Sequence, residues 1–170
     1  MLTGLANRKQ LIEKLNDMLA RMQRKSDVAA IVYLDLDGFK LINDTHGHEA
    51  GDRVLKVVAR TLAEISDDRC HVARHGGEEF VVLFRGKTLR EAYETLDATR
   101  ETLANRKLVN RATDTSFGQV SFSGGLADIF AFRDPRAALK AADEALYVAK
   151  DTGRNRIVLA NQSGPIQAAA

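Results

Sequence analysis

Residues 28–36, VAAIVYLDL, form a nearly unbroken apolar run that only Asp35 interrupts, near its end. A second carboxylate, Asp37, follows just beyond the run. A run of this length that is rich in β-branched residues predicts a strand buried on both faces. A strand of this kind needs other elements packed against each face of its sheet. The run therefore favours helices packed on a central sheet.

Helical and strand patterns alternate along the rest of the chain. Apolar residues at helical spacing, with capping residues at three of the starts, indicate the helices. The expected helices occupy residues 7–22, 39–48 (broken at Gly47), 54–65, 88–103 and 134–149, and the expected strands occupy 28–36, 70–75, 78–84, 116–127 and 156–160. This order predicts an α/β (α+β) domain with a mixed sheet of about five strands flanked by helices. The domain is expected over residues 1–160, followed by a flexible tail over 161–170, which has no periodicity.

Asp35 and Asp37 lie two residues apart, so both side chains are expected on the same face of the strand. A divalent cation would neutralise two such carboxylates, because hard cations prefer oxygen ligands. A solvated strand end explains the same spacing, since aspartate is common in turns. The spacing alone leaves both interpretations open.

Gly76 and Gly77 separate two strand patterns, and Glu78 and Glu79 follow at once. A two-residue glycine loop predicts a tight hairpin, because such turns need positive φ. Glycine also lets a ligand approach the backbone closely. Neighbouring strand residues face opposite sides, so only one of the two glutamates can easily share a site with Asp35. An exposed turn with two solvated acids is the simpler alternative.

The formal net charge of +2 gives no reason to expect nucleic acid or lipid as a partner. No apolar run approaches the roughly 20 residues that span a bilayer, so we expect no membrane contact. Cys70 is the only cysteine, which fits a reducing compartment such as the cytoplasm. The abrupt start suggests a catalytic or binding module cut from a longer protein.

RHGGEEF at residues 74–80 resembles the signature of the GGDEF family, the diguanylate cyclases, with Glu in the variable third position and Phe80 in the last. Three further stretches are similar to family motifs in the same order: LTGLANR (2–8), DLDGFKLINDTHGHEAGD (35–52) and ADEALYVAKDTGRN (142–155). The similarity runs from about Leu2 to Leu159. It implies the palm-like fold of nucleotidyl cyclases and polymerases. It also implies condensation of two GTP molecules into cyclic di-GMP, with release of two pyrophosphates.

The resemblance also implies roles for individual residues. Asp35 and Glu78, with the backbone carbonyl of Leu36, would hold Mg²⁺ or Mn²⁺, and Glu79 would be a further metal contact. Glu78 would also take the proton of the attacking hydroxyl, and Lys40 would stabilise charge at the transferring phosphate.

Four more residues would bind the phosphates of the nucleotide. Backbone N–H groups around Gly38 and Phe39 would cradle the terminal phosphates, because a glycine-led helix start attracts anions. Lys150 and Arg154 would clamp the same phosphates. From the residues alone, cations that complement a helix C-terminus are the preferred explanation of this pair.

Asn43 and Asp52 would read guanine, because a carboxylate accepts from the N–H groups that adenine lacks. His48 is expected near the nucleotide, although a turn histidine explains it as well. His46, His71 and His75 belong to none of the functional assignments.

Each subunit would bind one GTP, so catalysis would require a homodimer with the two sites face to face. An upstream sensory domain, absent from this chain, usually enforces that pairing in the family. Many members also carry an Arg-x-x-Asp site for product inhibition. Asp67 and Cys70 stand at those two places here, and Arg69 is out of register. We therefore expect no feedback inhibition through that site.

A second departure is SGG at 123–125, where the family often has a branched residue between Ser and Gly; it is expected to cost strand order rather than activity.

Three other classes of function compete with catalysis. A catalytically silent GTP- or dinucleotide-sensing module is the main alternative, and such relatives usually have a damaged signature loop. The other two are a different nucleotidyl cyclase or polymerase-like palm, and a structural or partner-binding domain. The intact Asp35, Glu78 and Glu79 favour the cyclase.

Overall fold

The computed structural model describes residues 2–21, 29–132, 134–160 and 167–168. Within these residues, helices and strands alternate as the sequence indicates. The elements are α1 (Arg8–Arg21), β1 (Ala29–Leu36), α2 (Phe39–His46), α3 (His48–Ala63), β2 (Cys70–Arg74), β3 (Glu79–Arg85), α4 (Leu89–Ala104), β4 (Val109–Asn110), β5 (Thr115–Ser116), β6 (Phe122–Asp128), the 3₁₀ helix η1 (Ile129–Ala131), α5 (Pro135–Asp151), β7 (Ile157–Leu159) and β8 (Gln167–Ala168).

The described strands form a main sheet in the order β2-β3-β1-β6-β7-β8. β1 lies between β3 and β6 and is antiparallel to both, whereas β6 and β7 are parallel. This is the expected mixed sheet, and the two-residue β8 adds a short sixth strand to the expected number of about five. β8 lies in the segment 161–170 that was expected as a tail, and the other eight residues of that segment lie outside the described residues.

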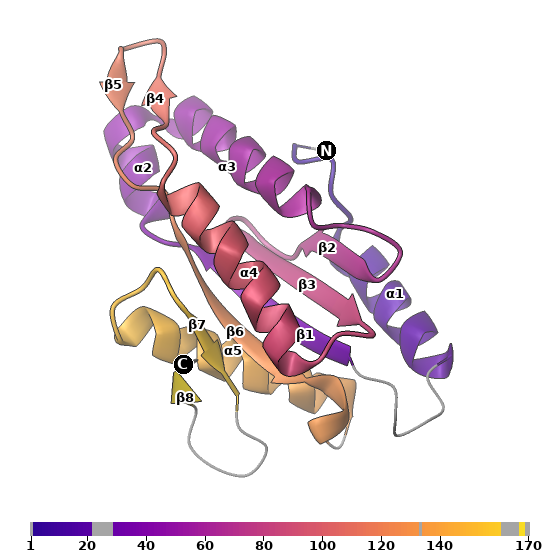
Figure 1. Cartoon of the computed structure of the whole chain (residues 1–170). Helices are drawn as coiled ribbons and strands as arrows, with labels where there is room; N and C mark the ends of the chain where they lie inside the picture. Colours follow the sequence, from indigo (N-terminus) through magenta and orange to yellow (C-terminus); the bar gives the residue numbers. More distant parts are fainter. Residues whose placement is uncertain (1, 22–28, 133, 161–166, 169–170) are drawn as a thin grey trace.

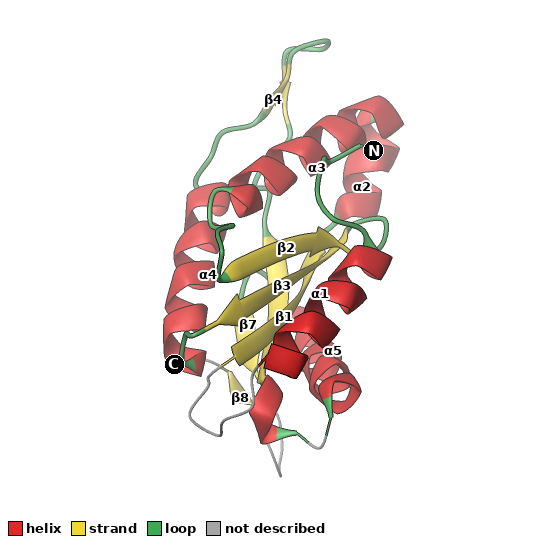
Figure 2. Ribbon diagram, turned by 90° about the vertical axis from the view of Figure 1, so that its right-hand side faces the viewer, coloured by secondary structure: helices red, strands yellow, loops and turns green. Residues whose placement is uncertain are grey.

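The residues of β1 alternate between two apolar cores, one on each face of the sheet. Val32 and Leu34 belong to the core that includes residues of α3 and α4. Ile31 and Tyr33 belong to the other core, which includes buried alanines of α5. Figure 2 shows α4 on one side of the sheet and α1 and α5 on the other. The expectation that the 28–36 run is buried on both faces is therefore confirmed for the described residues 29–36.

The α2–α3 corner differs from the expected helix bounds. α3 begins at His48, six residues before Val54, which was the first residue of its apolar pattern. Gly47, at φ 90°, ends α2 by donating its N–H to Asn43 O (2.8 Å) and begins α3 by accepting from the N–H of Gly51 (3.1 Å). The first turns of α3 are mostly polar, so they carry no apolar periodicity.

The segment 116–127 is not a single strand. Ser116 ends β5, Gly118 turns the chain at φ 72°, and β6 begins at Phe122. β5 pairs with β4, and the two form a ribbon that extends beyond the body of the domain above α2 and α3 (Figure 1). The ribbon was not expected, because two-residue strands leave no alternating pattern.

Gly124 and Gly125 do not interrupt β6, contrary to the expected loss of strand order. Both pair with β1 on one side and β7 on the other. A Cβ at Gly124 would meet Leu34 Cδ2 at 2.6 Å, and a Cβ at Gly125 would overlap the carbonyl oxygen of Ala142 in α5. The glycines therefore let α5 and Leu34 pack closely on the sheet.

The β2–β3 connection is longer than the expected two-residue turn. It comprises residues 75–78, and neither Gly76 nor Gly77 has positive φ. The N–H groups of His75 and Gly76 both donate to Glu79 O, at 2.8 and 3.3 Å. The Arg74 guanidinium donates to the carbonyls of both glycines, so side-chain bonds hold the shape that a tight turn would otherwise supply.

The remaining helix starts follow their capping residues. Asn7 and Gln10 exchange backbone-to-side-chain hydrogen bonds before α1. Thr88 and Glu91 form the same reciprocal box before α4, and Asp134 caps α5 with Pro135 at its first position. None of the described helices is both long enough and apolar enough to cross a bilayer.

Candidate active site

Asp35 and Glu79 are direct cross-strand partners at the ends of β1 and β3. Both side chains lie on the α5 face of the sheet, because their strand positions alternate in step with Tyr33 and Val81 of that core. Glu78 lies one residue before β3, and its carbonyl accepts from the N–H of Leu36 at 3.2 Å. The antiparallel register therefore gathers three carboxylates at one corner.

The Asp35 side chain is largely enclosed, with 15% of its surface exposed. Lys150 Nζ lies 3.1 Å from Asp35 Oδ1 as an ion pair. Oδ1 is buried, and the Lys150 ammonium is the cation that it faces. Burial raises the pKa of the Asp35 carboxyl above its ordinary value, the Lys150 ammonium opposes that shift, and Glu78 and Glu79 add to it.

Glu79 contacts a second group on this face. Tyr33 Oη donates to Glu79 Oε2 at 3.4 Å, and burial with the nearby carboxylate raises the pKa of the Tyr33 phenol. The His75 ring packs edge-on against Tyr33, with centroids 4.9 Å apart. No functional role was predicted for Tyr33 or His75. The signal for Tyr33 was present, because it lies two residues before Asp35 on the same strand.

A divalent cation fits the donor set at this corner. An enclosed carboxylate with two further carboxylates nearby is the kind of group that a cation stabilises. Among the residues that the structure describes, no three His, Cys, Asp or Glu side chains form a ready metal cluster. The expected ligands, Asp35, Glu78 and the carbonyl of Leu36, include only two side chains, and the Glu79 carboxylate is turned to Tyr33.

Asp37 has a different environment, although it follows Asp35 by two residues. Ser121 Oγ and Ser123 Oγ donate to its two carboxylate oxygens at 2.8 and 2.6 Å. The backbone N–H of Asn155 donates to Oδ2 at 3.0 Å. Asp37 is therefore neither a solvated strand end nor directed at the acidic corner. It ties the end of β1 to β6 and to the turn before β7.

The start of α2 lies directly after Asp37. Gly38, at φ 64°, is the residue before the first turn, where an L side chain would be strained. Phe39 is half-buried against the core, whereas Lys40 is exposed. The first turn of a helix leaves backbone N–H groups without intrahelical partners, so this is where the predicted phosphate contacts of Gly38 and Phe39 would be made.

Asn43 of α2 packs against Gly51 of α3, the residue before Asp52. A Cβ at Gly51 would overlap Asn43 Oδ1, so glycine is required for this approach of the two helices. Asp52 and His48 are exposed on α3. The structure thus brings Asn43 close to the backbone beside Asp52. His46 instead stacks against Phe117, with ring centroids 4.7 Å apart.

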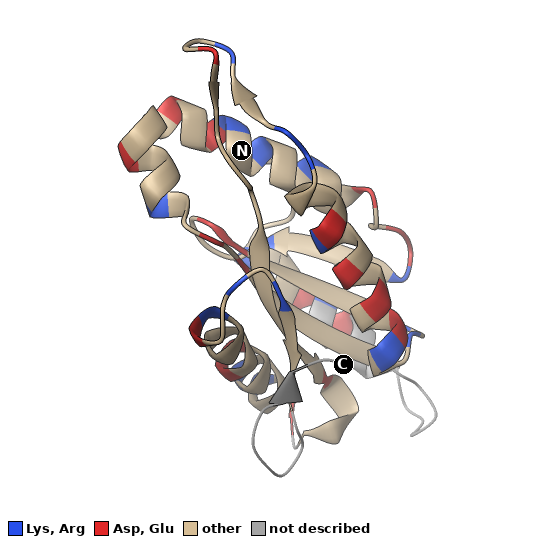
Figure 3. Ribbon diagram, turned by 60° about the vertical axis from the view of Figure 1, so that its left-hand side comes forward, with Lys and Arg blue, Asp and Glu red and all other residues tan. Residues whose placement is uncertain are grey.

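Lys150 and Arg154 come from the last turn of α5 and the turn that follows it. Arg154 and Asn155 adopt left-handed φ values of 60° and 46°. Figure 3 shows acidic residues at the ends of β1 and β3 beside the C-terminal end of α5 and this basic turn. Lys150 faces Asp35, and the Arg154 side chain is exposed.

Two surface cavities, of about 550 and 580 Å³, lie away from this corner, one beside the β2 edge and one beside the β4–β5 ribbon. None of the expected site residues lines either cavity.

Residues 67–70, where the Arg-x-x-Asp motif of other family members would lie, form a tight turn. Asp67 Oδ1 accepts from the N–H of Arg69 at 2.7 Å, and the Asp67 N–H donates to Cys70 O. Cys70 is buried at the start of β2, and burial raises the pKa of its thiol to about 12. Neither residue offers the cation of the family motif.

The fold and this corner together define an α/β domain whose acidic strand ends, glycine-led helix start and basic turn suit a metal-bound phosphate. Residues 1–156 match the model of one family, described as diguanylate cyclase, GGDEF domain. The chain belongs to the GGDEF family of diguanylate cyclases, which confirms the resemblance drawn from its motifs.

Individual relatives agree with this assignment. The chain is 37% identical to diguanylate cyclase DgcP of Pseudomonas aeruginosa over 94% of its own length but only 23% of that protein. The GGDEF domain of DgcB from Caulobacter crescentus, solved in complex with c-di-GMP, superposes with a TM-score of 0.88 at 34% identity, covering 95% of this chain and 92% of that one. An active GGEEF domain of a diguanylate cyclase from Vibrio cholerae gives 0.83 at 29% identity, covering 94% and 99%.

Proposed function

We propose that this chain is a catalytic domain that condenses two GTP molecules into cyclic di-GMP and releases two pyrophosphates. The Asp35 carboxylate carries the proposal, because in an intact GGEEF domain it lies enclosed beside Glu78 and Glu79 and faces the Lys150 ammonium. Asp37, in contrast, accepts hydrogen bonds from two serine hydroxyls and has a structural role.

Asp35, Glu78 and the carbonyl of Leu36 would hold Mg²⁺ or Mn²⁺, with Glu79 as a further contact. The metal supplies neutralisation of the phosphate charge. Glu78 accepts the proton of the attacking 3′-hydroxyl, and exposed Lys40 stabilises negative charge at the transferring phosphate.

The phosphates of GTP are bound by both ends of the chain. The N–H groups at Gly38 and Phe39 donate to the terminal phosphates. Lys150, held by Asp35 in the ligand-free domain, is already at the site when a phosphate arrives, which lowers the entropic cost of recruiting it. Arg154 adds a second cation from the exposed side of the turn.

Asn43 and Asp52 recognise guanine, and His48 lies nearby on the same helix as Asp52. Asp52 is exposed, so its carboxylate is available to accept from the guanine N–H groups. ATP lacks those donors, and we expect it to be a poor substrate.

Catalysis takes place between two copies of the chain, because each copy supplies one GTP and half of the site. Two large apolar side chains would be available to such a contact. Leu41 is 69% exposed next to Lys40, and Tyr147 is 71% exposed one turn before Lys150.

Control of the domain depends on features outside the described site. Asp67 and Cys70 would not bind product as an Arg-x-x-Asp motif does, so we expect no feedback inhibition there. The chain spans about a quarter of DgcP, and a sensory segment that enforces dimers would lie in the remainder of such a protein. The cytoplasm, where GTP is available, is the proposed compartment.

Turnover measured over a range of protein concentrations tests the proposal. The chain is incubated with Mg²⁺ and GTP, or with ATP as the control, and products are identified by mass. A rate of cyclic di-GMP formation that rises more steeply than linearly with protein concentration supports both the reaction and its dependence on a dimer. GTP binding without product, persisting after dimers are enforced by a fused coiled coil, would instead support a silent GTP-sensing module.

A further inference from the structure

Arg100 is an almost enclosed cation on α4 that the proposed chemistry does not use. Its side chain is 13% exposed. Nε lies 2.7 Å from Asp97 Oδ1, and Nη2 lies 3.5 Å from Glu101 Oε1 on the same helix. The remaining nitrogen, Nη1, donates to Asn155 Oδ1 at 2.9 Å. The guanidinium therefore joins α4 to the turn after α5.

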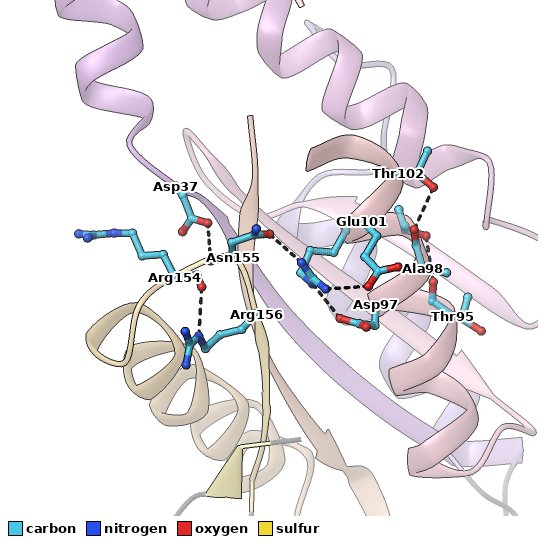
Figure 4. Close-up of polar contacts among 11 residues, drawn as sticks. Asp37, Thr95, Asp97, Ala98, Glu101, Thr102, Arg154, Asn155 and Arg156 are labelled. Atoms are coloured by element: carbon cyan, nitrogen blue, oxygen red, sulfur yellow. Dashed lines mark hydrogen bonds and ion pairs between the residues drawn. The ribbon is translucent and has the colours of Figure 1, made fainter. Parts of the chain in front are cut away.

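Asn155 is held from two sides. Its side-chain oxygen accepts from Arg100, and its backbone N–H donates to Asp37 Oδ2 at 3.0 Å. Figure 4 shows Asn155 between Asp37 on one side and Asp97 and Glu101 on the other. Asp37 is itself fixed by two serine hydroxyls of the β6 segment. Asn155 is thus anchored to β1 and to α4 at once.

The backbone of this turn needs such anchors. Arg154 and Asn155 are consecutive non-glycine residues at φ 60° and 46°. A left-handed conformation is unfavourable for an L residue, so two in succession persist only when other contacts hold them. The Arg154 N–H donates to Ala149 O at 2.9 Å, which fixes the helix end but not the residues beyond it.

Anchoring Asn155 also fixes the direction in which the neighbouring Arg154 side chain points. In Figure 4 the side chains of Asn155 and Arg154 point to opposite sides of the turn. Arg154 O accepts from Arg156 Nε at 3.1 Å, which orients the same peptide. The exposed Arg154 guanidinium is therefore presented on the side away from α4.

We propose that Arg100 is a positioning residue for substrate phosphate. Through Asn155 it holds the turn in the conformation that presents Arg154 to the phosphates of GTP. This inference rests on the proposed function, because it assumes that Arg154 binds those phosphates. Arg100 itself touches no substrate, so its loss weakens GTP binding rather than the chemical step.

Two variants remove the link in different ways. Arg100→Ala deletes the donor. Asn155→Gly deletes the acceptor but keeps the N–H to Asp37 and accepts the left-handed backbone without strain. Both are expected to raise the KM for GTP about tenfold and to change kcat less than about twofold. Arg100→Lys is expected to retain only part of the GTP affinity, because a lysine cannot contact all three partners of Arg100.

Arg90→Ala is the matched control, because Arg90 lies on the same helix and pairs with Glu94 at 3.1 Å but is 87% exposed. It is expected to leave KM unchanged. Circular dichroism and thermal unfolding confirm that each variant is folded at the assay temperature. Asn155→Gly keeps the test valid if Arg100→Ala unfolds the domain.

A double-mutant cycle decides whether Arg100 acts through Arg154. In an Arg154→Ala background, Arg100→Ala is expected to weaken GTP binding, measured by calorimetry, by no more than about twofold further. Full additivity of the two effects, or an unchanged KM in Asn155→Gly, overturns the inference. GTP binding is measured separately from turnover. A wild-type chain that binds GTP without making cyclic di-GMP would contradict the proposed reaction, but the double-mutant cycle would still test the role of Arg100 in binding.

Discussion

Lys150 Nζ lies 3.1 Å from Asp35 Oδ1, so the last turn of α5 holds a cation against the acidic end of β1. The two residues come from opposite ends of the chain, and the packing of α5 on the sheet brings them together. The ion pair offsets part of the cost of burying Asp35. It also keeps the corner assembled before any ligand binds.

Asp35→Asn is expected to abolish turnover while the domain stays folded. The amide removes a charge whose burial is unfavourable and also the ion pair with Lys150, and because these two effects oppose each other, stability changes by no more than about 1 kcal/mol. Loss of a metal ligand lowers cyclic di-GMP formation by at least about 100-fold. Mass-resolved product assays and thermal unfolding measure the two effects. Substantial activity in this variant would refute the metal assignment.

Asp37→Asn is expected to have a different effect, because its two oxygens accept from three protein donors. An amide replaces one acceptor by a donor and leaves buried partners unsatisfied, which costs about 2–4 kcal/mol. Urea unfolding measures the loss. Asp44→Asn, at an exposed position of α2, is the control. Equal stability of the Asp37 and Asp44 variants would show that the Asp37 bonds are not structural.

Asp35 and Asp37 show where sequence reasoning stopped. Their position correctly indicated the end of the strand, because that feature depends on a local pattern. Their different roles depend on Lys150, Ser121 and Ser123, which only tertiary packing brings to them. The same limit applied to the β4–β5 ribbon, since strands of two residues leave no pattern. The capped helices and the long apolar strand were recognisable, because their signals are contiguous.

The two glycines of the signature loop are expected to respond differently to alanine. A Cβ at Gly77 meets nothing within 4 Å, and its φ is not positive, so Gly77→Ala leaves stability within about 0.5 kcal/mol. Its turnover is nevertheless expected to fall about tenfold or more, because the ligand needs that space. A Cβ at Gly76 would come within 2.8 Å of Glu79 Oε2. Gly76→Ala is therefore expected to displace the Glu79 carboxylate even when no ligand is bound. Full activity of Gly77→Ala would exclude close approach of ligand at this glycine.

Asp52→Asn is expected to reduce the preference for GTP over ATP without changing stability, since Asp52 is exposed. Gly51→Ala is expected to weaken GTP binding by another route, because the added methyl would overlap Asn43 Oδ1 and move that side chain. Calorimetry with both nucleotides measures the preference. Lys56→Ala, exposed on the same helix, is the control. An unchanged preference in Asp52→Asn would remove Asp52 from guanine recognition.

Cys70 makes stability sensitive to alkaline pH in a direction that its environment fixes. Burial raises the pKa of the thiol to about 12, whereas a thiol in the unfolded chain titrates near pH ~8.5. Between these values the native state keeps a proton that the unfolded state has lost, so the free energy of unfolding falls as pH rises. The slope from this group is at most ~1.4 kcal/mol per pH unit. Between pH 8 and pH 10, urea unfolding is therefore expected to show a larger loss of unfolding free energy in the wild type than in Cys70→Ser.

In the native protein the Cys70 thiol should also react with a disulfide reagent only slowly at pH 8 and rapidly in denaturant. Equal losses in the two proteins, or fast native reaction, would mean that Cys70 is accessible as a thiolate.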